Sequence, residues 1–183
     1  MIVLLVIDMQ AGLFAQAPRH DADGLVDRIN ALGRVVRQAG GLVIFIQHAG
    51  PQGDTFEPGT DGWTLLESLQ REAGDRVVSK QACDAFYQTD LARILQDHDA
   101  RELIVTGCAT DFCVDTTIRA AASRDYEVIV AEDGHTTADR PHMDAVSVIR
   151  HHNWVWENLI LPGRRIRVLP AARIAEDVKS RTS

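Results

Sequence analysis

The chain has 183 residues, of which 45% are hydrophobic and 25% are charged, and its formal net charge is −7 at pH 7. This length and composition are sufficient for a hydrophobic core, so we expect one globular domain over residues 1–183. The negative charge and the absence of a long Lys/Arg block argue against nucleic acid or an anionic membrane as a partner.

Neither a membrane segment nor a disulfide framework is indicated. No stretch approaches the roughly 18 apolar residues that span a bilayer. The apolar run at the N-terminus is short, lacks basic residues and ends in Asp8, so it predicts a first strand rather than a signal peptide. Three cysteines are too few and too unevenly spaced for a set of disulfides, which favours a cytoplasmic location.

Strand-like and helix-like segments alternate along the whole chain. Apolar runs predict strands at about residues 2–8, 42–48, 76–80, 102–107, 126–132 and 165–169. Helical patterns lie between them, at about residues 21–39, 90–98, 112–124, 142–158 and 170–179. We expect Gly40-Gly41 to end the first helix and Thr89 to be the N-cap of the second. The alternation predicts an α/β fold: a single doubly wound, Rossmann-like parallel sheet of about six strands with helices on both faces.

Three reactive side chains lie at the ends of predicted strands. Asp8 ends the first strand, Lys80 ends the third, and Cys113 opens the helix that follows the fourth. Carboxyl ends of parallel strands share one edge of a sheet, so we expect these side chains to form one site. A helix N-terminus and a nearby ammonium group both favour a thiolate, which makes Cys113 a candidate nucleophile and Asp8 a candidate proton carrier.

The stretch from residue 49 to residue 60 carries two prolines and three glycines and predicts a long irregular loop. Loops of that length usually cover a site. A dinucleotide-binding domain on the same kind of sheet is disfavoured, because no G-x-G-x-x-G follows the first strand. A phospho-receiver module is disfavoured because the chain lacks clustered acids at the strand ends.

Three motifs, taken together and in order, carry a resemblance to a known family. They are Ile7-Asp8-Met9-Gln10; Lys80 followed by Asp84-Ala85-Phe86 and Thr89; and Gly107-Cys108-Ala109-Thr110-Asp111-Phe112-Cys113-Val114. With Asp133-Gly134-His135-Thr136-Thr137 further on, the chain resembles the isochorismatase-like cysteine hydrolase superfamily over nearly its whole length. The resemblance implies a catalytic triad of Asp8, Lys80 and Cys113. It also implies a cis peptide bond between Cys108 and Ala109 and an oxyanion hole formed by the backbone N–H groups of Ala109 and Cys113.

The resemblance further implies hydrolysis of a C–N bond of a small molecule. Amide, lactam and carbamoyl bonds are cleaved by relatives such as streptothricin hydrolases, carbamoyl-sarcosine amidases and nicotinamidases, through a thioester on the cysteine. Two alternatives stay open: a vinyl ether hydrolase of the isochorismatase type, which belongs to a branch without this cysteine, and a non-catalytic binding or scaffold member of the fold. Because relatives are commonly dimers or tetramers, we expect a homo-oligomer.

We expect neither a cofactor nor a metal site. Nicotinamidases of this superfamily bind a metal through an Asp-x-His motif after the second strand, whereas this chain has Gln47-His48-Ala49. Asp54 lies nearby in that loop, but one His with one loop Asp makes a weak site. Cys108 and Cys113 form a C-x4-C pair, but no second pair accompanies them.

Candidate substrate contacts come from the strand ends and from the long loop. Gln10 and Phe14 follow Asp8 and either line or buttress the pocket, and His48 ends the second strand as a pocket wall. Trp63 is either a lid or part of the core, and His135 either faces the pocket or caps a turn. The full set of expected substrate-binding residues is Gln10, Phe14, His48, Trp63, Phe86 and His135. We expect Cys83 and Cys108 to be structural.

Overall fold

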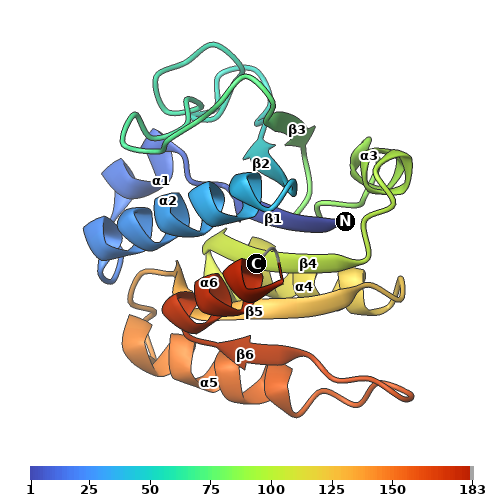
Figure 1. Cartoon of the computed structure of the whole chain (residues 1–183). Helices are drawn as coiled ribbons and strands as arrows, with labels where there is room; N and C mark the ends of the chain where they lie inside the picture. The colour runs from blue at the N-terminus through green and yellow to red at the C-terminus, as the bar shows by residue number, and fades with distance from the viewer. Residues whose placement is uncertain (182–183) are drawn as a thin grey trace.

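One parallel sheet of six strands organises the molecule. The computed structural model describes residues 1–181. The strands are β1 (Ile2–Ile7), β2 (Leu42–His48), β3 (Arg76–Lys80), β4 (Glu102–Cys108), β5 (Glu127–Thr136) and β6 (Arg167–Leu169). They lie in the order β3-β2-β1-β4-β5-β6, with every neighbouring pair parallel (Figure 1). This order confirms the doubly wound α/β fold.

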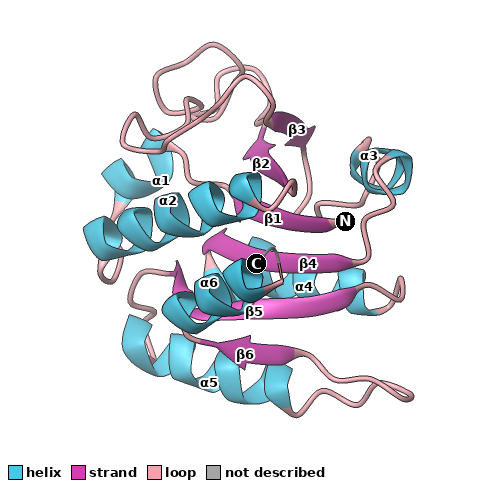
Figure 2. Cartoon of the chain, viewed as in Figure 1, coloured by secondary structure: helices cyan, strands magenta, loops and turns pink. Residues whose placement is uncertain are grey.

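Helices cover both faces of the sheet (Figure 2). They are α1 (Ala11–Gln16), α2 (Ala22–Gln38), α3 (Leu91–Asp97), the π-helical turn η1 (Thr110–Val114), α4 (Asp115–Ala122), α5 (Ala145–Glu157) and α6 (Ala171–Ser180). Apolar side chains of α2 and α6 share one core cluster, and those of α3, α4 and α5 share the other. Within residues 1–181, no helix is both long enough and apolar enough to cross a membrane.

The central strand β1 shows why these strands read as unbroken apolar runs. Val3, Leu5 and Ile7 belong to the core cluster on the α4 side, whereas Leu4 and Val6 belong to the cluster on the α2 side. Successive side chains of a strand point to opposite faces, and here both faces are covered by helices. Every one of these five side chains is therefore buried.

Helix α2 ends where the sequence predicts. The backbone N–H of Gly40 donates to Arg37 O at 3.0 Å, and that of Gly41 donates to Val36 O at 2.8 Å. Gly40 has a φ of +72°, the left-handed conformation that glycine adopts without a steric penalty. This cap turns the chain directly into β2.

Three local expectations are corrected by the structure. Helix α1 was not predicted, because six residues are too few to show a helical period. The N-cap of α3 is Asp90 rather than Thr89; the Thr89 hydroxyl instead accepts the Leu91 N–H at 3.2 Å. The loop after β2 is longer than predicted: residues 49–75, all of them described, contain no helix or strand.

Candidate active site

The site lies at the carboxyl edge of the sheet, where the chain winds in opposite directions from neighbouring strands. β1 pairs with β2 on one side and with β4 on the other. Asp8 follows β1 directly, Lys80 is the last residue of β3, and Cys113 lies in η1, just after β4. Ligands of doubly wound sheets bind at this kind of switch point, so the topology brings the three predicted residues to one place.

The ammonium group of Lys80 contacts both of the other side chains, Asp8 and Cys113. Its Nζ atom lies 2.7 Å from Asp8 Oδ2 and donates hydrogen bonds to Cys113 Sγ at 3.2 Å and to Ala82 O at 3.0 Å. The side chain of Lys80 is 0% exposed and that of Asp8 is 2% exposed. Asp8 Oδ1 is buried and has no hydrogen-bond partner among residues 1–181. One oxygen of the carboxylate is therefore fixed by the ammonium group, and the other is free to accept a proton.

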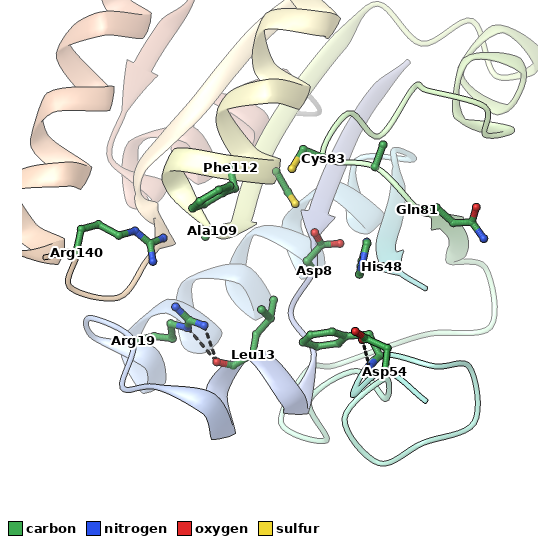
Figure 3. Close-up of a pocket in the computed structure, with 13 residues that line it drawn as sticks. Asp8, Leu13, Arg19, His48, Asp54, Gln81, Cys83, Ala109, Phe112 and Arg140 are labelled. Atoms are coloured by element: carbon green, nitrogen blue, oxygen red, sulfur yellow. Dashed lines mark hydrogen bonds between the residues drawn. The ribbon is translucent and has the colours of Figure 1, made fainter. Parts of the chain in front are cut away.

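The backbone at Asp8 turns this carboxylate toward the pocket. Asp8 has a φ of +46°, a left-handed conformation that Asp tolerates better than most residues. Its N–H donates to Ile46 O at 2.9 Å, and its carbonyl oxygen accepts the Gln10 N–H at 2.9 Å. These bonds end β1 and set the direction of the side chain, which projects into the pocket in Figure 3.

Glycine at position 107 allows β4 and β1 to approach at the site. Gly107 pairs with Ile7, and its φ is +124°. A Cβ atom there would collide with the carbonyl oxygen of Ile7 and would lie 2.6 Å from its nitrogen. No other residue type fits this position without moving the backbone, which would separate Asp8 from the turn that carries Cys113.

Cys113 sits in a turn that long-range contacts hold in place. The Val114 N–H donates to Ala109 O at 3.1 Å, which is the i→i+5 bond of a π-helix. The peptide bond between Cys108 and Ala109 is cis. Arg140, from the loop after β5, donates to both carboxylate oxygens of Asp111 at 2.7 and 2.8 Å. The turn is thus tied to the loop that follows β5.

The surroundings of Cys113 favour the thiol over the thiolate that the sequence suggests. Burial raises the pKa of the Cys113 thiol, the Asp8 carboxylate raises it further, and Lys80 opposes both; the net shift is upward. Burial also lowers the pKa of Lys80, but its interactions, above all the ion pair with Asp8, outweigh burial and hold this pKa above its usual value. The resting site therefore contains a neutral thiol beside an Asp8–Lys80 ion pair.

A pocket of about 610 Å³ opens over these residues (Figure 3). This volume suits a small molecule. Two of the three site residues, Asp8 and Cys113, line it together with residues from several other elements. The full lining is Asp8, Leu13, Arg19, His48, Asp54, Phe56, Gln81, Ala82, Cys83, Ala109, Phe112, Cys113 and Arg140.

Of the six expected substrate contacts, His48 lines this pocket. Its ring is half-buried and packs edge-on against Phe56, with ring centroids 5.9 Å apart. Burial, followed by the charge of Lys80, lowers the pKa of His48, so the imidazole is neutral at neutral pH. It offers a polar wall without a charge.

Gln10 is a buttress and not a pocket wall. Its fully buried side chain donates to His48 O at 2.9 Å and to Trp63 O at 2.8 Å, and it accepts the His48 N–H at 2.8 Å. Gln10 therefore ties the end of β2 to the long loop. Trp63 lies behind this contact, and its Nε1 is buried with no partner in the described chain.

Phe14, Phe86 and His135 are also outside the pocket lining. Phe14 packs against the core on the α2 side. Phe86 is buried and stacks on Tyr126, with ring centroids 5.8 Å apart. These aromatic rings follow the site residues along the chain, but they pack against the core, because the core buries more of their apolar surface than the pocket wall would.

His135 supports the Cys113 turn from behind. Its Nδ1 lies 2.9 Å from Thr110 Oγ1 and its Nε2 lies 2.9 Å from Asn153 Oδ1. Since the Asn153 amide nitrogen donates to Glu132 O, Asn153 Oδ1 accepts from His135 Nε2, and Nδ1 accepts from Thr110. Burial lowers the pKa of His135 to about 4, so the ring stays neutral.

Several residues that line the pocket were not predicted from the sequence. Arg19 follows the unpredicted helix α1, and Arg140 lies in the loop after β5, so neither stands at a predicted strand end. Cys83 was expected to be structural but lines the pocket, whereas Cys108 is buried and its pKa is raised by burial to about 12. Within residues 1–181, no three His, Cys, Asp or Glu side chains lie close enough together to hold a metal ion.

Comparison with known proteins assigns the chain to a family. The family model described as the isochorismatase domain matches residues 3–156, so the chain belongs to the isochorismatase family of hydrolases. A crystal structure of an isochorismatase family protein superposes with a TM-score of 0.83 at 32% identity, covering 92% of this chain and 97% of that one.

Among curated relatives, streptothricin hydrolase from Streptomyces noursei is 35% identical over 145 residues, which cover 79% of this chain and 58% of the relative. The chain thus spans little more than half of that protein's length. Ureidoacrylate amidohydrolase RutB from Klebsiella pneumoniae subsp. pneumoniae is 29% identical over 167 residues, which cover 71% of each chain.

Proposed function

We propose that this isochorismatase-family hydrolase cleaves a C–N bond of a small molecule through a thioester on Cys113. The observation that carries the proposal is the contact of Lys80 Nζ with both Asp8 Oδ2 and Cys113 Sγ at the floor of the pocket. A nucleophile, a proton acceptor and a fixed positive charge are the parts that covalent acyl transfer needs. The names of the two relatives, a streptothricin hydrolase and an amidohydrolase, support the same class of reaction.

The first half of the proposed reaction acylates the enzyme. As Cys113 Sγ attacks the carbonyl carbon, its proton passes to the free Oδ1 of Asp8, which has no competing partner in the described chain. The carbonyl oxygen becomes an oxyanion, for which the backbone N–H groups of Ala109 and Cys113 are the proposed donors. Asp8 then gives the proton to the leaving nitrogen, the C–N bond breaks, and the amine or ammonia departs.

The second half releases the acid. Asp8 takes a proton from water, the hydroxide oxygen attacks the thioester carbon, and the C–S bond breaks. The proton returns from Asp8 to the sulfur, so that the thiol and the ion pair are restored. Throughout, Lys80 stays charged and holds the carboxylate, because the ion pair with Asp8 keeps its pKa raised against the effect of burial.

The first test is turnover of a panel of amides, lactams and carbamoyl compounds by the wild type and by Cys113→Ala. We expect the variant to lose at least about 10³-fold in kcat, because the nucleophile is gone. Acid-quenched wild type should show Cys113 carrying the mass of the acyl group. Cys83→Ala, which removes another thiol from the same pocket, is the matched control and should retain turnover.

Undiminished hydrolysis by Cys113→Ala would contradict the proposal. Hydrolysis of a vinyl ether without acylation of Cys113 would instead favour the isochorismatase-type reaction.

A further inference from the structure

Arg19 is the one pocket cation whose charge is not matched by a carboxylate among residues 1–181. Its side chain lines the pocket and is half-buried. Nε and Nη2 donate to Leu13 O at 3.0 and 2.8 Å, and no ion pair in the described chain includes it. A guanidinium group held by a backbone carbonyl keeps its full positive charge at the pocket surface.

The other cations of the pocket region are compensated. Lys80 forms an ion pair with Asp8, and Arg140 forms a two-point contact with Asp111. The remaining pocket acid, Asp54, is solvent-exposed, so its field is screened, and its Oδ1 accepts the Phe56 N–H at 2.7 Å. The half-buried wall of the pocket is therefore positively charged.

Arg19 and Arg140 lie on the same side of the pocket. Both guanidinium groups lower the pKa of the buried Cys108 thiol, opposing the larger effect of burial. Figure 3 shows both of them on the side of Ala109 away from His48 and Asp54. An anionic group entering the pocket on this side meets two positive charges, only one of which is already paired.

The hydrogen-bonding capacity of Arg19 also fits an anion. A guanidinium group has five N–H donors, and the carbonyl of Leu13 occupies two of them. Three N–H donors remain, including both on Nη1. The planar arrangement of such donors matches a carboxylate and holds it in a fixed orientation. Because Leu13 O already fixes the side chain, little rotamer entropy is lost when the anion binds.

We propose that Arg19 binds a carboxylate of the substrate, so that the pocket selects small amides or carbamoyl compounds that carry a carboxylate away from the scissile carbonyl. This inference rests on the proposed function. In this arrangement Cys113 reaches the carbonyl carbon while Arg19 holds the distant end of the molecule. Arg19 is thus a specificity-determining residue, and the Asp8–Lys80–Cys113 cluster does the chemistry.

Three matched compounds test the proposal: N-carbamoylglycine, its neutral amide, and the cationic (2-aminoethyl)urea. We expect the wild type to prefer the anionic compound by at least about tenfold in kcat/KM. Arg19→Gln should lower kcat/KM for this compound about 10- to 100-fold, mainly through KM, because a charge-assisted hydrogen bond is lost from both ground and transition state. For the neutral compound, kcat/KM of Arg19→Gln should equal that of the wild type. Arg19→Lys should retain part of the preference for the anionic compound.

Arg34→Gln is the matched control, since Arg34 is an exposed arginine on α2 whose Nη2 lies 3.5 Å from Gln70 Oε1, outside the pocket. Its kinetics should equal those of the wild type. Equal losses of Arg19→Gln on all three compounds would overturn the inference. So would a wild-type preference for the neutral or the cationic compound.

A binding measurement separates this inference from the proposed function. Titration calorimetry of Cys113→Ala with N-carbamoylglycine should show binding that the double variant with Arg19→Gln loses, whether or not the wild type hydrolyses the compound. Binding without turnover of any compound on the panel would count against the proposed chemistry but support the carboxylate site. Equal binding of the anionic and neutral compounds would refute the carboxylate site even if hydrolysis is observed.

Discussion

At the residue scale, the state of Cys113 depends on two opposite charges that lie next to it. Lys80 alone would favour a thiolate, but Asp8 cancels much of that effect, and burial disfavours any charge on sulfur. A raised pKa keeps the resting thiol protonated, and a protonated thiol reacts slowly with electrophiles. In the proposed mechanism it loses its proton to Asp8 only as it attacks.

This arrangement predicts the effect of Asp8→Asn on alkylation. Removing the negative charge leaves Lys80 unopposed, so the pKa of Cys113 should fall, and iodoacetamide should label Cys113 at least about tenfold faster at pH 7. The same variant should not hydrolyse the substrate, because the proton acceptor is missing. The rate is measured by mass spectrometry of peptides from a Cys83→Ala background.

Asp54→Asn is the control for this experiment, because it removes a pocket carboxylate that is not among the main influences on the pKa of Cys113. Its labelling rate should match the wild-type rate. Slower or equal labelling of Asp8→Asn would show that Asp8 does not suppress the thiolate.

At the scale of elements, the site depends on how closely two parallel strands approach at their carboxyl ends. β4 and β1 stay in register up to Gly107, whereas β4 and β5 shift register between Val105 and Gly107. The shift lets β5 extend to Thr136, beyond the predicted end of this strand, and brings His135 behind the Cys113 turn. The close approach and the bulge both occur at a single glycine.

Gly107→Ala should therefore destabilise the fold. The new methyl group meets the backbone of Ile7, and the φ of +124° is unfavourable for alanine, so we expect a loss of about 3 kcal/mol or more in the free energy of unfolding. Urea denaturation followed by circular dichroism measures it. Gly74→Ala is the control, because no heavy atom lies within 4 Å of a Cβ at Gly74. Equal stability of the two variants would mean that β1 and β4 can separate freely.

At the scale of the whole molecule, segments that are distant in sequence surround one edge of the sheet. α1 is fixed to the long loop by bonds from Ala11 N–H to Thr64 O and from Gly12 N–H to Gly62 O, both 2.9 Å long. The loop in turn carries Asp54 and Phe56 to the pocket. A homo-oligomer and a cytoplasmic location both stay predictions. Trp154 on α5, with 64% of its surface exposed, is a candidate residue for an interface between subunits.

Global stability should fall in mild acid because of His135. Its pKa is about 4 in the folded protein and 6.5 when unperturbed, so the unfolded chain binds more protons between these values. The free energy of unfolding should therefore decrease as pH falls from 6.5 to 4, by about 3 kcal/mol from this residue. Urea denaturation at several pH values measures the slope.

His135→Gln should be less stable at pH 7, because buried hydrogen bonds are lost, but should show a shallower decline toward pH 4. His142→Gln, at an exposed position, is the control and should keep the wild-type slope. A slope in His135→Gln as steep as in the wild type would mean that His135 titrates normally in the folded protein.

The sequence by itself determined the sheet, the longer helices and the residues at the strand ends. Strands buried on both faces must be apolar throughout, so β1, β2 and β4 are visible as unbroken runs, and Asp8 stands out where the β1 run stops. Lys80 ends the shorter run of β3. These signals are local: they depend on the residue types within a few positions.

Only the tertiary structure decided the pocket wall and the charge on Cys113. Arg19 follows a short helix and Asp54 lies in a long loop, and long-range contacts set the paths of both segments to the pocket. Phe86 does not line the pocket, because its ring is buried in the core. The thiol stays neutral because burial and Asp8, a residue 105 positions earlier in the chain, act on it together. Burial and the distances between remote charges are properties of the folded chain, and no local pattern contains them.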